Sequence, residues 1–166
     1  MCGIFGYVGT RTDAPSLVLS GLKKLDYRGY DSWGVSYQTP SGITTHKSTS
    51  ILTGIEGAGL PQSRLAIAHT RWATTGSVSI KNAHPHASSD NRFTLAQNGI
   101  VENHLELKKQ LEDLGYKFIS DTDTEVIVRL IEHELTIQPK LIDALQKAFF
   151  RLTGRNTVII LDNLES

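Results

Sequence analysis

Alternation of apolar and polar residues dominates the N-terminal part of the chain and returns near its C-terminal end. Runs of this kind, bounded by turn residues, are typical of strands that bury one face. The residues Pro40 to Gly42 predict a hairpin, and the dipeptide Asn98-Gly99 predicts a tight turn after a strand. The expected strands are Ile4–Val8, Gly34–Gln38, Ile43–Lys47, Arg64–Trp72, Phe93–Gln97 and Thr157–Leu161.

Other segments repeat apolar residues at the spacing of a helix and carry typical boundary residues. The expected helix starts are Asp13 with Pro15, Asn103 with Glu106, Thr122 with Glu125, and Pro139. Gly115 and Gly154 are expected to end two of these helices. Residues 54–61 and 76–91 show little periodicity and are expected to be loops. Because strands come in groups and are followed by helices, the order predicts an α+β fold rather than alternating βαβ units.

Composition narrows the class of protein without choosing a function. The chain has 166 residues, 17 Lys plus Arg and 17 Asp plus Glu, so it suits one domain, residues 1–166, with no formal net charge. This balance argues against nucleic acid or an anionic membrane as a partner. No secretory signal or membrane-length apolar run is present, and a single cysteine fits a reducing compartment, so we expect a cytoplasmic protein.

The single cysteine, Cys2, directly follows the initiator Met1. If Met1 is removed, Cys2 carries a thiol and a free amine, whose ordinary pKa of about 7.7–8.0 lets it act as a base. The alternative is a small buried apolar residue, and the short motif alone favours that alternative.

Three further positions have both a structural and a chemical interpretation. Arg71 on a buried strand is expected either to form an internal ion pair or to bind a substrate carboxylate. Asn98 and Gly99 form a turn, or alternatively donate N–H groups to an oxyanion. Asp123 is part of a helix cap, or alternatively binds an ammonium group. Taken singly, the structural interpretation is preferred for the turn and the cap.

A metal site is not predicted. His69, His84 and His86 with Cys2 lack the spacing of zinc ligands, and no second cysteine is available. The glycine-rich residues 54–59 lack the Lys-Ser/Thr ending of a phosphate-binding loop. We therefore expect neither a metal nor a cofactor.

Taken together, the motifs resemble those of a known family. They are Met1–Gly6, Tyr27–Ser32, His69–Gly76, Asn82–His86, Gln97–Asn103 and Thr122–Glu125, in family order and spacing. The chain resembles class II glutamine amidotransferases, and within them the glutaminase domains of the glutamine–fructose-6-phosphate aminotransferases. The resemblance implies an N-terminal-nucleophile fold, a four-layer αββα sandwich of two antiparallel sheets.

The resemblance also implies a role for each motif. Cys2 attacks the side-chain amide of L-glutamine and forms a γ-glutamyl thioester, and Asn98 and Gly99 stabilise the oxyanion. Arg71 binds the α-carboxylate of glutamine, and Asp123 binds its α-ammonium group. Arg28 is implied to position the terminus that carries the nucleophile. Thr74 is implied to line the glutamine site, and His84 to support its walls. Trp72 is implied to lie where ammonia leaves.

The implied partner is the sugar-phosphate isomerase domain, which uses the ammonia to convert fructose 6-phosphate into glucosamine 6-phosphate and is absent from this chain. The family's domain continues past this point with more strands, so one sheet is expected to be short. Thr75 departs from the family, which usually has histidine there, so glutamine affinity or loop closure is expected to differ. The alternatives are a non-catalytic glutamine-binding regulatory module, if Met1 is retained, and a fragment that folds poorly alone.

Overall fold

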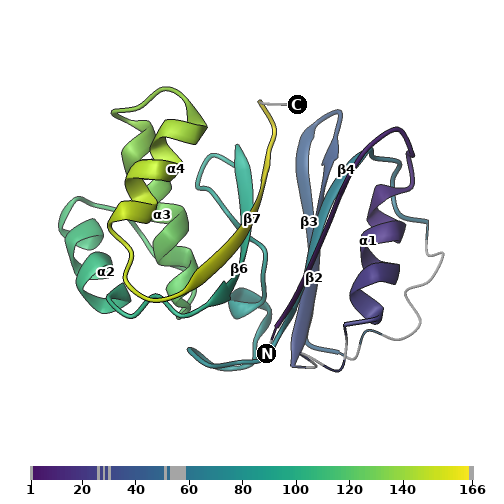
Figure 1. Ribbon diagram of the computed structural model, residues 1–166, viewed down its shortest axis with the longest axis horizontal. Helices are drawn as coiled ribbons and strands as arrows, with labels where there is room; N and C mark the ends of the chain where they lie inside the picture. Colours follow the sequence, from purple (N-terminus) through teal and green to yellow (C-terminus); the bar gives the residue numbers. More distant parts are fainter. Residues whose placement is uncertain are drawn as a thin grey trace.

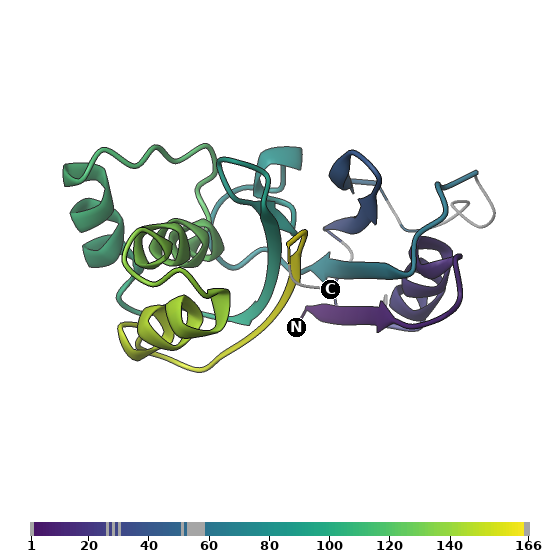
Figure 2. The same cartoon turned by 90° about the horizontal axis from the view of Figure 1, so that it is seen from above.

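The computed structural model describes residues 2–25, 27, 29, 31–50, 52 and 59–164. Their strands form two antiparallel sheets that face each other, with helices on both outer sides (Figure 1). This is the four-layer αββα arrangement, so the predicted fold class is confirmed. The N-terminal end of β1 lies between the two sheets (Figure 2). No helix in these ranges is long and apolar enough to cross a membrane.

The first sheet has the strand order β1-β4-β2-β3. Its strands are β1 (Gly3–Val8), β2 (Ser32–Thr39), β3 (Gly42–Ser48) and β4 (Leu65–Arg71). Helix α1 (Ala14–Lys23) covers its outer face, where Val18 and Leu22 pack on Val35 and Ala66. Because β1 runs antiparallel to β4, with Gly3 opposite Thr70, the start of β1 meets the end of β4.

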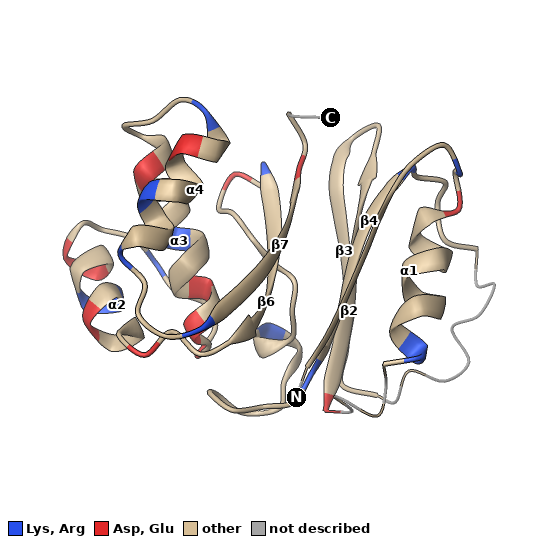
Figure 3. Ribbon diagram, viewed as in Figure 1, with Lys and Arg blue, Asp and Glu red and all other residues tan. Residues whose placement is uncertain are grey.

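The second sheet has the order β5-β6-β7 and carries most of the helices. Its strands are β5 (His86–Ala87), β6 (Phe93–Gly99) and β7 (Asn156–Asp162), and the helices outside it are α2 (His104–Asp113), α3 (Asp123–Leu135) and α4 (Leu141–Phe150). Helix α3 is nearly all buried and provides much of this core. Charges of both signs are interspersed on these helices, while the strands carry few (Figure 3).

The first sheet closely approaches the segment before β5 at a point that bears on the site. A β-carbon on Gly34 of β2 would lie 2.2 Å from the carbonyl oxygen of His84. Only glycine therefore lets this carbonyl rest against the sheet, and any other residue there would displace the segment around His84.

The strand predictions are confirmed, but the predicted turn at Asn98-Gly99 is wrong. Both residues end β6 and pair with Thr157 and Asn156 of β7, which the chain reaches only after α2, α3 and α4. Gly99 has a φ of 137°, which explains the glycine without a hairpin. The predicted loop 76–91 contains a short 3-10 helix, η2 (Ile80–Asn82), and strand β5. Most of the predicted loop 54–61 lies outside the described residues.

The predicted helices are present, but two of their caps are wrong. Asn103 occupies the cap position of α2 without a side-chain cap bond, because its amide instead bonds Arg151 and Thr153. Asp13 likewise makes no cap bond and instead pairs with Arg11. Helix α4 begins at Leu141, so Pro139 lies just before the helix rather than in its first turn.

Candidate active site

The thiol of Cys2 lies where the first sheet ends. Its sulfur accepts a hydrogen bond from the Trp72 backbone N–H at 3.2 Å and lies 3.7 Å from the Trp72 carbonyl oxygen. The next residue is fixed to β4, since the Gly3 N–H donates to the Thr70 hydroxyl at 3.1 Å. Cys2 is only half-buried. The thiol is therefore held on backbone and remains accessible, unlike a packed apolar residue.

The second sheet brings Asn98 to the same place. Its amide Nδ2 donates to the Cys2 carbonyl oxygen at 3.0 Å. A cavity of about 580 Å³ opens beside the pair. It is lined by Cys2, Trp72, Thr74, Asn98, Gly99, Ile100, Glu102 and Arg155. Hence five of the residues predicted from the sequence surround one cavity that contains the thiol.

A second, much smaller space of about 20 Å³ also reaches Cys2 and shares Trp72, Thr74 and Gly99 with the larger cavity. Arg71, Asp123 and His84 line it together with Cys2. Asp123 is 5% exposed and accepts a hydrogen bond from the Val101 N–H at 2.8 Å, so one carboxylate oxygen is engaged by backbone. The structure thus places a buried cation and a buried anion beside the nucleophile.

The guanidinium of Arg71 bonds backbone carbonyls rather than a carboxylate in the described part of the chain. It donates to the oxygens of Ser77 at 3.1 Å and Gly76 at 3.3 Å, and to that of Thr75. Burial lowers the pKa of Arg71 from its ordinary value. A space of about 20 Å³ is too small for an amino acid, so in this state the guanidinium is occupied by the carbonyls of residues 75–77.

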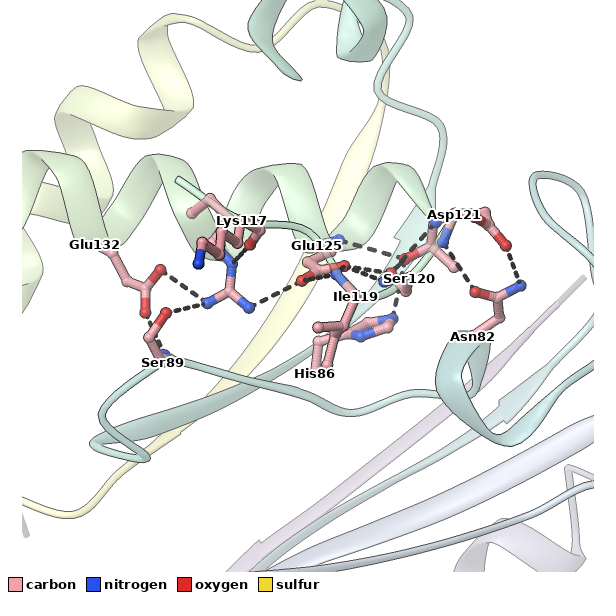
Figure 4. Close-up of polar contacts among 11 residues, drawn as sticks. Asn82, His86, Ser89, Lys117, Ile119, Ser120, Asp121, Glu125 and Glu132 are labelled. Carbon is pink, nitrogen blue, oxygen red and sulfur yellow. Dashed lines mark hydrogen bonds and ion pairs between the residues drawn. The ribbon is translucent and has the colours of Figure 1, made fainter. Parts of the chain in front are cut away.

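The side chain of Asn82 connects the loop after β4 to the segment just before α3. Asn82 is fully buried, and its Nδ2 donates to the Ser77 carbonyl at 2.9 Å. Its Oδ1 accepts from the Asp121 N–H at 2.9 Å (Figure 4). Because Asn82 bonds both segments, a displacement of residues 75–77 also acts on the position of the segment that carries Asp123.

The N-terminus of α3 is fixed by a buried carboxylate. Glu125 accepts from the N–H groups of Ile119 and Ser120 and pairs with Arg129 at 2.8 Å (Figure 4). Burial opposes its ionisation, but these hydrogen bonds outweigh burial and lower its pKa. Of the predicted capping box, the half in which Thr122 accepts from the Glu125 N–H is present at 3.4 Å.

Three histidines form a buried column behind the site. The ring of His84 lies 4.3 Å from that of His69 and 5.1 Å from that of His86, centroid to centroid. Burial lowers the pKa of all three, that of His69 to about 4. The His69 and His84 rings are tilted by 37°, and the His84 and His86 rings meet edge-on at 60°. The described residues contain no cluster of His, Cys, Asp or Glu that could hold a metal ion.

This column makes stability depend on pH. Because the folded protein keeps these rings neutral, their stabilising effect is complete above pH 6.5 and is lost as the pH falls toward the lowered pKa. His69 alone is expected to remove about 3 kcal/mol between pH 6.5 and 4, at 1.36 kcal/mol per unit. Urea unfolding followed by circular dichroism over this range measures it.

The histidines and the carboxylates contribute to the free energy of unfolding in different pH ranges. The lowered pKa of Glu125 makes its contribution fall only below about pH 4.5. A free energy of unfolding that stays flat between pH 6.5 and 4.5 would contradict neutral buried histidines.

Sequence reasoning assigned most of the site but missed several of its residues. Arg28 falls outside the described residues, so its predicted role has no structural account. Gln97 lines the smaller space, and Glu102 and Arg155 line the larger cavity, without having been singled out. The alternation along β6 gives a signal for Gln97, but Arg155 arrives from a distant segment, and nothing in its local sequence marks it.

Two antiparallel sheets packed face to face between helices, with a thiol at the first strand, define the class of N-terminal-nucleophile domains. Residues 54–149 match the family described as glutamine amidotransferase domain, and the chain belongs to that family.

Two similar proteins carry the name of one enzyme within this family. Glutamine–fructose-6-phosphate aminotransferase (isomerizing) from Thermus thermophilus is 45% identical over 163 residues, and that from Bacillus subtilis is 41% identical over 166 residues. These matches cover 96% and 98% of this chain but 26% and 27% of the relatives, so the chain spans about a quarter of their length.

A solved structure agrees with the fold. Glutamine phosphoribosylpyrophosphate amidotransferase from B. subtilis, complexed with ADP and GMP, matches with a TM-score of 0.83 and 29% identity. The match covers 98% of this chain and 35% of that one.

Proposed function

We propose that this chain hydrolyses L-glutamine to L-glutamate and ammonia through a γ-glutamyl thioester on Cys2. The observation that carries the proposal is the position of the single thiol, which lies between an amide donor, Asn98, and the buried charges of Arg71 and Asp123. A nucleophile, an oxyanion donor and a pair of opposite charges are what selective hydrolysis of a free amino-acid amide requires.

Each chemical step uses a group at this position. The thiolate of Cys2 adds to the amide carbon of glutamine, and the Cys2 amine, free once Met1 is removed, takes the thiol proton. Nδ2 of Asn98 leaves the Cys2 carbonyl and, with the Gly99 N–H, donates to the oxyanion. The tetrahedral intermediate collapses, ammonia leaves with the proton, and water then hydrolyses the thioester to glutamate. Arg28 is proposed to position the nucleophile's terminus.

Binding uses the smaller space after the loop opens. Arg71 exchanges the carbonyls of residues 75–77 for the α-carboxylate of glutamine, and Asp123 takes the α-ammonium group with its remaining acceptor capacity. Thr74 and His84 form walls of this site. The backbone of residue 75 is bound by Arg71, so its side chain lies in the loop that covers the guanidinium. Loop closure is therefore the property that threonine in place of the family's histidine is proposed to affect.

In a longer protein the ammonia is proposed to pass to a sugar-phosphate isomerase domain that converts fructose 6-phosphate into glucosamine 6-phosphate in the cytoplasm. The names of the similar proteins support this step. Trp72, which lines the larger cavity and is 44% exposed, is proposed to lie where ammonia leaves.

The chain alone is expected to be a plain glutaminase. Purified chain is incubated with glutamine and fructose 6-phosphate together, and glutamate, ammonia and glucosamine 6-phosphate are measured. Equal amounts of glutamate and ammonia support the proposal. Glutamine hydrolysis that does not exceed the rate in buffer alone refutes it. Any glucosamine 6-phosphate would show that this chain contains a transferase site.

Asn98→Ala is expected to lower kcat by roughly 10²–10³-fold with little change in KM, because it removes one oxyanion donor but no proposed contact with glutamine in the ground state. Steady-state kinetics on glutamine measure both constants. The control is Asn163→Ala, which alters an asparagine that lines neither space of the site and should retain full activity. A rise in KM alone would contradict the oxyanion role of Asn98.

A further inference from the structure

His69 makes a contact that the proposed mechanism has not used. It lies on β4, is fully buried, and is held between Ile4 of β1 and Gly34 of β2 in the sheet register. Its ring nitrogen Nε2 lies 3.0 Å from the carbonyl oxygen of Gln97 and 3.0 Å from Oδ1 of Asn98. One imidazole nitrogen therefore reaches both the backbone of β6 and the side chain of the oxyanion donor.

The carbonyl of Gln97 decides which form the ring takes. A carbonyl oxygen only accepts, so Nε2 must carry a hydrogen and donate it. The other nitrogen, Nδ1, is buried and has no partner among the described residues, as expected for the nitrogen without a proton. Burial lowers the pKa of the ring to about 4, so this neutral form persists through neutral pH.

The tautomer of the His69 ring in turn fixes the orientation of the Asn98 side-chain amide. Because Nε2 donates, Asn98 must present its oxygen to the ring, and its NH₂ group must point the opposite way, toward Cys2. The distance of 3.0 Å from Nδ2 to the Cys2 carbonyl oxygen agrees with this orientation. A flipped amide would offer an oxygen to the oxyanion and repel it.

We propose that His69 is a positioning residue: by donating from Nε2, it fixes the amide of Asn98 with its NH₂ group toward the nucleophile. This rests on the proposed glutaminase function. The Gln97 carbonyl sets the tautomer of the imidazole, and the imidazole sets the orientation of the Asn98 amide. His69 itself touches neither the thiol nor the proposed glutamine atoms.

Two substitutions separate the donor from the bulk of the ring. Glutamine can place an amide N–H near the position of Nε2, whereas leucine fills the space and donates nothing. His69→Leu is expected to lower kcat by roughly 10- to 10³-fold, with loss of a whole oxyanion donor as the upper limit, and to leave KM nearly unchanged. His69→Gln is expected to retain most of the activity.

A double-mutant cycle tests whether His69 acts through Asn98. In the Asn98→Ala background, His69→Leu should cost little further kcat, because the donor that it positions is already gone. An equal loss in both backgrounds would show a merely structural role and would overturn the proposal. Thermal unfolding of each variant excludes loss of the fold as the cause.

A measurement on the unsubstituted chain keeps the test independent of turnover and of the folding of variants. The ¹⁵N shifts of the His69 ring at neutral pH are expected to report a neutral ring protonated at Nε2, with Asn98 side-chain amide protons protected from exchange. A ring protonated at Nδ1 would overturn the inference. Absence of glutamine turnover would instead refute the proposed function, and the ring shifts would still decide the orientation.

Discussion

Cys2→Ala is expected to lower the kcat for glutamine hydrolysis by roughly 10⁴–10⁶-fold, because the covalent route disappears with its nucleophile. The remaining groups still bind glutamine but supply no thioester. Because Cys2 is the single cysteine, one equivalent of an electrophilic glutamine analogue should label the chain once and abolish turnover. Kinetics on glutamine and intact mass measure the two effects, and substantial turnover by Cys2→Ala would contradict the assignment.

The state of Met1 provides the matched control for the amine of Cys2. A retained Met1 converts that amine into an amide and removes the proposed base without altering the thiol. Intact mass separates the two forms, and only the trimmed chain should turn over glutamine. Equal activity from both forms would show that another base serves Cys2. A chain that retains Met1, binds glutamine and does not hydrolyse it would instead match the regulatory-module alternative.

The sequence predicts the elements of this fold because their signals are local. The alternation along β4 and the cap at Thr122 each need only neighbouring residues to be recognised. The prediction fails where the partner is distant in sequence. Asn98-Gly99 is the strongest hairpin signal in the chain, yet its strand pairs with β7 across three helices. The side chain of Asn103 likewise leaves its own helix for the backbone at Arg151 and Thr153.

The site shows the same limit. Motifs indicate Cys2, Arg71 and Asp123, but no local pattern places them around one thiol. Cys2 precedes β1, Arg71 ends β4 and Asp123 begins α3, so the three come from separate segments. The partners of Arg71 are loop carbonyls, so neither of the two sequence alternatives describes this state. His69 was considered only as a metal ligand that lacked the spacing, because its contact with Asn98 crosses from one sheet to the other.

The two charged residues are expected to control glutamine binding rather than its chemistry. Arg71→Ala and Asp123→Ala should each weaken binding by about 2–5 kcal/mol, because each leaves a desolvated charge of the substrate without a partner. This corresponds to a loss of kcat/KM of about 30- to 4000-fold at 1.4 kcal/mol per factor of ten. The nucleophile and the oxyanion donors remain, so kcat at saturation should change less.

Truncated substrates assign each charge to its partner and guard against a general disturbance of the site. The analogue of glutamine that lacks the α-amine should be a poor substrate for the unsubstituted chain, and Asp123→Ala should not weaken it further. The analogue that lacks the α-carboxylate should in the same way be insensitive to Arg71→Ala. Arg71→Lys tests geometry at constant charge and should recover only part of the affinity, because a point charge cannot bind a carboxylate through two parallel N–H bonds. If both analogues respond to both substitutions, the residues act through loop position, with Asn82 as the connection between them, and the pairing of charges proposed for glutamine is wrong.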